Sequence, residues 1–156
     1  MYFYPQKVKY PTDTQIEIWT MKRGQLTGRE IAAKRSVTPG MVSKTLTEAN
    51  TRVKALLQNA ARMNKITLKV ISPEHGYARG LSHMFNVKAY ITFSPENGVQ
   101  VWYDHKGDCV KCDKYSYCRE SILQEFKERN IEIENRSLRP TDLVEILLST
   151  VEKMLE

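Results

Sequence analysis

The sequence predicts an α+β fold, in which a helical N-terminal part precedes a smaller part built from antiparallel strands and helices. Three observations lead to this prediction. Helical start and stop signals recur up to Asn64. From Ile66 the sequence changes to short stretches rich in β-branched and aromatic residues. After Cys118 the apolar residues return to helical spacing.

Composition favours a folded protein with an anionic partner. The chain has 156 residues, of which 41% are hydrophobic, and this is enough for a core. Lys and Arg outnumber Asp and Glu by 24 to 18, which gives a formal charge of +6. A basic balance suits nucleic acid or an acidic membrane surface. No apolar run approaches the roughly 20 residues of a membrane span, and the N-terminus does not resemble a secretion signal, so we expect a cytoplasmic protein.

Two N-terminal helices are predicted from their caps. Thr12 is followed three residues later by Gln15, and Thr27 by Glu30, the spacing of a capping box. Gly24 is placed to end the first helix, which spans residues 12–23. The second helix is about two turns long and is expected to end at residue 35 or 36.

A long third helix follows. Thr38 is the expected N-cap and Pro39 the first helical residue, where its missing amide hydrogen costs nothing. No helix breaker occurs from Gly40 to Asn64. The apolar residues at alternating spacings of three and four are Leu46, Ala49, Val53, Leu56, Ala60 and Met63. This stripe indicates a helix–helix seam, either within the chain or between two copies of it.

Three strands are predicted in the second part, at residues 66–72, 86–93 and 98–105, with a hairpin turn at residues 94–98. Residues 73–85 are expected to form a loop or a short helix. Two helices then follow, from residue 118 or 119 to 130 and from 140 to 155. We therefore divide the chain into domains 1–64 and 65–156.

Residues 26–46 have the pattern of a helix-turn-helix. Ala32 is the small residue of the first helix, Val37 the buried turn residue, and Val42 and Leu46 the inner face of the second helix. The stretch LTGREIAAKRSVTPGMVSKTL resembles the DNA-binding domains of LuxR-type regulators, of sigma-factor region 4 and of archaeal Tfx-like regulators. The resemblance extends over about residues 12–57.

This resemblance implies a helix-turn-helix domain that binds duplex DNA. The sequence departs from the family pattern at two places, because Arg35 replaces the usual leucine and Ser36 the usual glycine. Both departures lie at the turn. The spacing of the apolar residues is unchanged.

The face of the third helix opposite Val42 and Leu46 is small and polar. Its candidate DNA-binding residues are Thr38, Pro39, Gly40, Ser43, Lys44 and Thr47. A small first turn lets the helix N-terminus enter the major groove, where its amides and dipole favour phosphate. Arg29 and Arg52 are the leading candidates for backbone contacts. Further candidates for such contacts are Lys22, Arg23, Lys34, Arg35 and Lys54.

A cysteine cluster provides the second signal. His105, Cys109, Cys112 and Cys118 lie within DHKGDCVKCDKYSYC, and an odd number of cysteines argues against a disulfide framework. Cys109 and Cys112 have the spacing of a zinc knuckle, and we expect zinc with His105 as fourth ligand. His75 or His83 is the alternative fourth ligand. Cys118 is expected to open a helix whose dipole favours its thiolate. An iron–sulfur cluster and a metal-free thiol group are the alternatives.

The sequence therefore predicts a transcriptional regulator rather than an enzyme: a homodimer that binds double-stranded DNA, with a zinc-stabilised regulatory or dimerisation domain at its C-terminus. A redox- or metal-responsive regulator that senses through the cysteines is one alternative. An RNA-binding or adaptor protein is another, and would use the aromatic residues Tyr90, Phe93, Trp102 and Tyr103. An enzyme is the weakest alternative, and would use His75, Tyr77, Arg79 and His83 in the predicted loop.

Overall fold

The computed structural model describes residues 8–156 and confirms the α+β class. The three N-terminal helices are α1 (Asp13–Arg23), α2 (Gly28–Arg35) and α3 (Pro39–Met63). The strands are β1 (Ile66–Ser72), β2 (Tyr77–Ser82), β3 (Val87–Ser94) and β4 (Gly98–Tyr103), and the last helices are α4 (Tyr115–Glu128) and α5 (Pro140–Met154). Short 3₁₀ helices, η1 (Pro73–His75) and η2 (Cys109–Lys111), precede β2 and α4.

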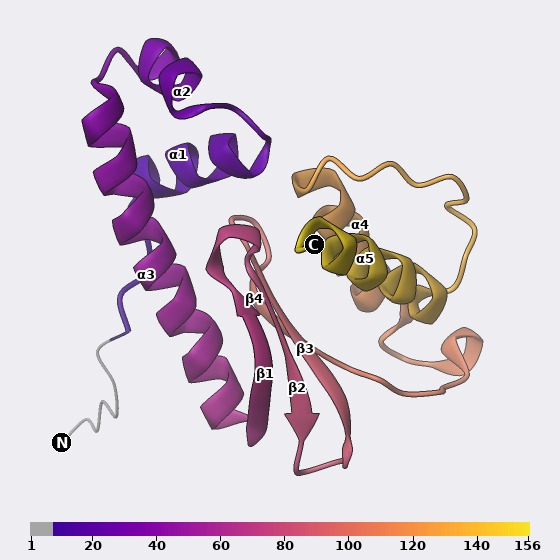
Figure 1. Cartoon of the computed structure of the whole chain (residues 1–156). Coiled ribbons are helices and arrows are strands. Elements are labelled where there is room, and N and C mark those ends of the chain that lie inside the picture. Colours follow the sequence, from indigo (N-terminus) through magenta and orange to yellow (C-terminus); the bar gives the residue numbers. More distant parts are fainter. Residues whose placement is uncertain (1–7) are drawn as a thin grey trace, which may run out of the picture.

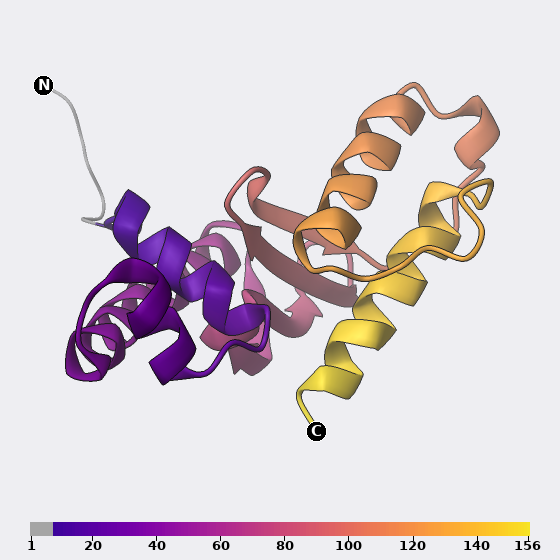
Figure 2. The same cartoon turned by 90° about the horizontal axis from the view of Figure 1, so that it is seen from above.

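Helices cover both faces of one antiparallel sheet whose strand order is β1-β2-β3-β4 (Figures 1 and 2). On one face Trp19 of α1 and Val53 and Leu57 of α3 pack against Ile91 and Phe93 of β3. This hydrophobic cluster crosses the predicted boundary at residue 64. On the other face α4 and α5 pack over the aromatic side chains of β2, β3 and β4. Within residues 8–156 no helix has the length and apolar character needed to cross a membrane.

The predicted capping signals are present in the structure. Thr12 with Gln15, and Thr27 with Glu30, form reciprocal capping boxes, and Gly24 caps the end of α1. The hydrogen bonds from Thr27 lower the pKa of Glu30 because they favour its charged form. Each box satisfies two amide groups that a helix start leaves without partners. The local sequence therefore fixes both helix starts.

Ser36 ends α2 in the left-handed region, with φ 54° and ψ 45°. Glycine adopts this conformation without a steric penalty, whereas serine does not. We expect Ser36→Gly to raise the free energy of unfolding by about 0.5–1 kcal/mol, measured by chemical denaturation. Ser36→Val should lower it, because a β-branched residue tolerates positive φ poorly. Equal stability of both variants would contradict this assignment of the turn.

The stripe of α3 packs mainly against the rest of the same chain. Ala49, Val53 and Ala60 are buried against the sheet, Leu56 packs on the same cluster, and Leu46 packs within the three-helix core. Only Met63, 73% exposed, remains outside. The intramolecular alternative therefore accounts for five of the six positions, and a dimer would need a different surface.

The strand β2 was not predicted. It lies within residues 73–85, which the sequence indicates as a loop or short helix, and it pairs with both β1 and β3. Its sequence YARGLS lacks a clear polar–apolar alternation and contains a glycine, which usually weakens a strand. Opposite it, β1 has an irregularity in register between Leu68 and Val70. The predicted hairpin turn at 94–98 is confirmed, with Gly98 at φ 65°.

A buried polar network fastens the C-terminal end of α4 to the sheet and to α1. Arg129 Nε lies 2.9 Å from Glu125 Oε2, and the Arg129 guanidinium donates to the carbonyls of His75 and Gly76. Arg23 of α1 donates to the Glu128 carbonyl at 3.0 Å and lies over the Trp19 ring. Burial lowers the pKa of Arg23 to about 10, so its side chain stays charged at neutral pH.

Candidate nucleic-acid interface

A small core of its own holds α2 against α3. Ile18, Ile31, Ala32 and Val42 are buried together, and Val37 and Leu46 pack against them. These include the residues that the helix-turn-helix pattern assigns to the inside. Figure 1 shows α2 and the first turns of α3 at the end of the molecule away from the sheet. The outer face of α3 is therefore free at this end.

The start of α3 presents little side-chain bulk. Thr38 caps the helix, because its hydroxyl accepts a hydrogen bond from Met41 N at 3.1 Å. Pro39 is the first helical residue and has no amide hydrogen. A Cβ placed on Gly40 would meet only the Thr38 hydroxyl, at 4.0 Å, so the space around it is open. A duplex could approach this turn closely.

All six predicted residues of the recognition face are exposed: Thr38, Pro39, Gly40, Ser43, Lys44 and Thr47. Arg29 is exposed as well. Arg52 is half-buried and donates to the Tyr10 carbonyl at 3.2 Å. The Thr47 hydroxyl donates to the Ser43 carbonyl within the helix, which leaves its methyl group and its acceptor capacity for a ligand.

This end of the molecule also carries cations that are not used internally. Arg35 forms an ion pair with Glu17 and is thereby engaged. Within residues 8–156, Arg29, Lys34 and Lys44 form no ion pair. Such charges can neutralise phosphates without first breaking a contact in the protein.

Met41 was not predicted as a functional residue. Its side chain is 55% exposed in the first turn of α3, beside Gly40 and Thr38. An apolar side chain at such a position can contact the methyl group of thymine. The sequence contained a signal for this, because Met41 lies between Gly40 and Val42, and Val42 was predicted to face inward.

The cysteines lie near one another but do not form a recognisable metal site. Cys109 is buried, Cys112 is exposed and Cys118 is half-buried. The Cys109 thiol is 3.5 Å from the Thr141 hydroxyl. Burial raises the pKa of Cys118, and the neighbouring Cys112 and Cys109 raise it further. The helix start was expected at Cys118, but α4 begins three residues earlier, at Tyr115, and burial acts against a thiolate at Cys118.

Zinc would need these side chains to converge. In residues 8–156 no three His, Cys, Asp or Glu side chains are grouped so that they could hold a metal ion. His105 lies exposed in the segment after β4. The thiols suit zinc chemically, but the described arrangement does not fit the ion, and zinc stays a prediction.

The side chains considered for other functions are used structurally. Phe93 is buried, Trp102 and Tyr90 pack beneath α4 and α5, and Tyr103 makes an edge contact with Phe85. These aromatics do not form an open stacking platform of the kind that single-stranded RNA uses.

The four residues of the enzyme alternative are dispersed. The Tyr77 hydroxyl donates to Glu152 at 2.6 Å, and Arg79 forms an ion pair with the same carboxylate. Their partner is thus a structural residue of α5. His75 bonds Ser72 at the start of η1, whereas His83 bonds Thr67 at the other end of the sheet. The four side chains therefore do not share one site.

Comparisons with known proteins give no relative. No family model, no curated protein and no solved structure matches the chain. Function is therefore inferred from the arrangement of α2 and α3 alone.

Proposed function

We propose that the protein is a transcriptional regulator that binds specific sequences of double-stranded DNA through α2 and α3. The C-terminal part, residues 65–156, would serve as its regulatory or dimerisation domain. Binding as a dimer would place two recognition helices about 34 Å apart on one side of the duplex.

One observation supports this proposal most strongly. The first turns of α3 are buried on the side of Val42, which is 1% exposed, and open on the side of Gly40, Ser43 and Lys44. Proline is common as the first residue of any helix, so Gly40 is the residue that an ordinary helical hairpin does not need. Gly40 costs roughly 1 kcal/mol of helix propensity relative to alanine. A glycine at this position would let a duplex approach the helix closely, which is a functional reason to keep it.

The direct experiment is selection of bound duplexes from a random pool by the full-length protein, followed by titration of the selected sequence at several salt concentrations. We expect one enriched motif and an affinity that falls steeply with salt. Recovery of unrelated sequences with equal affinities would contradict specific recognition. Preference for single-stranded RNA over the selected duplex would favour the RNA-binding alternative.

Lys44→Glu should weaken binding to the selected duplex by about tenfold or more, because it replaces a phosphate-neutralising charge by a repelling one. Ser43→Ala should relax base preference at one position of the motif rather than weaken binding to all sequences. Lys106→Glu is the matched control, since Lys106 is exposed on the loop between β4 and η2. Similar losses for Lys44→Glu and Lys106→Glu would indicate a nonspecific charge effect.

A redox- or metal-responsive regulator is the second candidate. Three free cysteines within ten residues favour it, because Cys109 and Cys112 lie near enough to Cys118 to affect its pKa. Elemental analysis of the purified protein tests the zinc prediction directly. About one zinc per chain, lost in Cys112→Ser, would support a metal centre. Metal-free protein whose DNA affinity responds to thiol oxidation would support a redox sensor instead.

A further inference from the structure

A groove lies between the C-terminal half of α3 and the edge strand β1, at the opposite end of α3 from the recognition face. Its volume is about 810 Å³. We call it the basic groove. Its lining includes Ala55, Arg62, Lys65, Ile66, Leu68 and Met84. No element of the described part of the chain pairs with the outer edge of β1.

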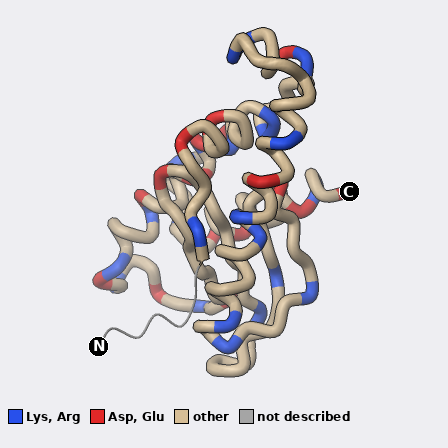
Figure 3. Tube along the Cα trace, turned by 90° about the vertical axis from the view of Figure 1, so that its left-hand side faces the viewer, with Lys and Arg blue, Asp and Glu red and all other residues tan. Residues whose placement is uncertain are grey.

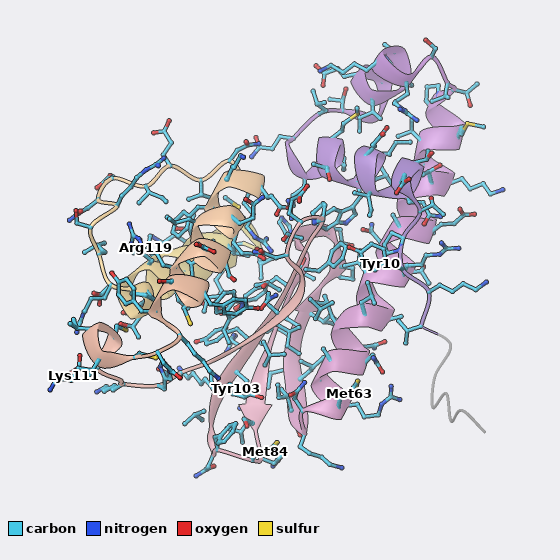
Figure 4. All side chains as sticks on the ribbon, turned by 180° about the vertical axis from the view of Figure 1, so that it is seen from behind. Tyr10, Met63, Met84, Tyr103, Lys111 and Arg119 are labelled. Carbon is cyan, nitrogen blue, oxygen red and sulfur yellow. The ribbon has the colours of Figure 1, made fainter. Side chains whose placement is uncertain are left out.

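Large apolar side chains are exposed around this groove. Met84 is 61% exposed, and the neighbouring Met63 and Phe85 are 73% and 56% exposed. Figure 4 shows Met63 and Met84 at the same end of the molecule, one on α3 and the other on the turn between β2 and β3. Clustered exposed apolar residues of this kind mark interaction sites, and flexible methionines suit partners of variable shape.

The charge around the groove has one sign. Residues 49–73 contain five basic residues and no Asp or Glu: Arg52, Lys54, Arg62, Lys65 and Lys69. Residues 75–95 add Lys88, whereas Arg79 is neutralised by Glu152 of α5 and does not contribute. Glu74, which interrupts this region, lies in η1 beside Trp19 at the other end of the sheet. Lys and Arg mark the lower end of the trace in Figure 3.

Arg52 and Lys54 are candidates for DNA contacts, but the recognition face does not account for Arg62, Lys65 and Lys69. Gly40 and Arg62 are 22 positions apart on one continuous helix, which at 1.5 Å per residue separates them by about 33 Å. A second copy of the chain is a poor occupant as well. It would bring an identical basic rim against this one, and like charges at an interface oppose association.

We propose that the basic groove binds a short acidic peptide segment of a partner protein, one that places apolar side chains against Leu68 and Met84 and carboxylates against Arg62 and Lys65. The groove supplies the apolar floor and the basic rim gives the charge preference. This binding surface is separate from the DNA site, so it stands or fails independently of the proposed function.

The test uses synthetic fluorescent peptides of about 15 residues and fluorescence anisotropy with the full-length protein. One acidic peptide places its apolar residues at helical spacing and the other at alternating spacing. Each has a matched version in which Gln replaces every Asp and Glu. We expect at least one acidic peptide to bind, its Gln version to bind about tenfold more weakly, and its affinity to fall with salt.

Variants of the protein locate the site. The double change Arg62→Glu with Lys65→Glu should weaken peptide binding about tenfold or more, and Met84→Ser should weaken it severalfold. Arg136→Glu is the control, because Arg136 is exposed on the loop between α4 and α5. DNA affinity should stay unchanged in all three. Thermal melting verifies folding, and the salt dependence of the unchanged protein provides a test that needs no variant.

Three results would overturn the proposal. The first is absence of binding by both acidic peptides. The second is equal binding by the acidic and Gln versions. The third is a dimer in sedimentation analysis that Met84→Glu converts to a monomer, because the groove would then be occupied by a second copy.

Discussion

Arg129→Met should lower the free energy of unfolding by about 3–5 kcal/mol, because it leaves a buried carboxylate without its counter-charge. The side chains of Arg129 and Glu125 are 3% and 0% exposed. The change also removes the hydrogen bonds that the guanidinium donates to the carbonyls of His75 and Gly76. Urea denaturation followed by circular dichroism measures the loss.

The double variant Arg129→Met with Glu125→Gln is the control. It removes both charges, so it should recover part of the lost stability while the carbonyl hydrogen bonds remain absent. A single variant that loses less than about 1 kcal/mol would show that water reaches Glu125 and that the ion pair is not essential. Arg139→Met removes an exposed ion pair with Asp142, and it should change stability far less.

The position of this network leads us to expect that its loss would also weaken the proposed DNA binding. Arg129 follows Glu128, whose carbonyl accepts the hydrogen bond from Arg23 of α1. A change at the end of α4 therefore removes support from α1, and α1 packs against α2 and α3 through Ile18. In the sequence, Arg23, Glu125 and Arg129 have the appearance of ordinary surface charges on helices. Their burial arises only when α1, the sheet and α4 meet.

The starts of α1, α2 and α3 could be predicted because their signals are local. The capping boxes at Thr12 and Thr27, and the order of Val37, Thr38 and Pro39, define helix starts within a few residues. The apolar stripe of α3 could also be recognised in the sequence, but the surface against which it packs could not. A stripe shows which side of a helix is buried, and whether the sheet or a second chain buries it depends on elements elsewhere in the sequence.

The cysteine stretch is a second case in which local spacing does not determine how side chains are placed in the fold. The spacing of Cys109 and Cys112 suggests a knuckle, but a ligand set requires that the backbone bring four donors to one point. Here η2 and the start of α4 at Tyr115 place Cys112 outward and Cys118 partly inward. Spacing alone does not encode these directions.

Gly80→Ala is the second change for which we expect a large effect, a loss of about 2–3 kcal/mol in the free energy of unfolding. A Cβ at this position would lie 2.1 Å from the carbonyl oxygen of Thr67 and 2.8 Å from its carbonyl carbon. Both atoms belong to the backbone of β1, so no side-chain rotation relieves the contact. The strands would have to separate next to the irregularity at Leu68 and Val70.

Gly28→Ala is the matched control, because a Cβ there meets nothing within 4 Å and Gly28 begins α2. Alanine should leave stability unchanged or raise it slightly. If both glycines tolerate alanine equally, β1 and β2 do not approach as closely as the structure shows. Gly80 lies in the segment 73–85, for which the sequence predicted a loop or a short helix. The glycine is instead needed because the backbone of β1 leaves no room for a side chain at this position of β2.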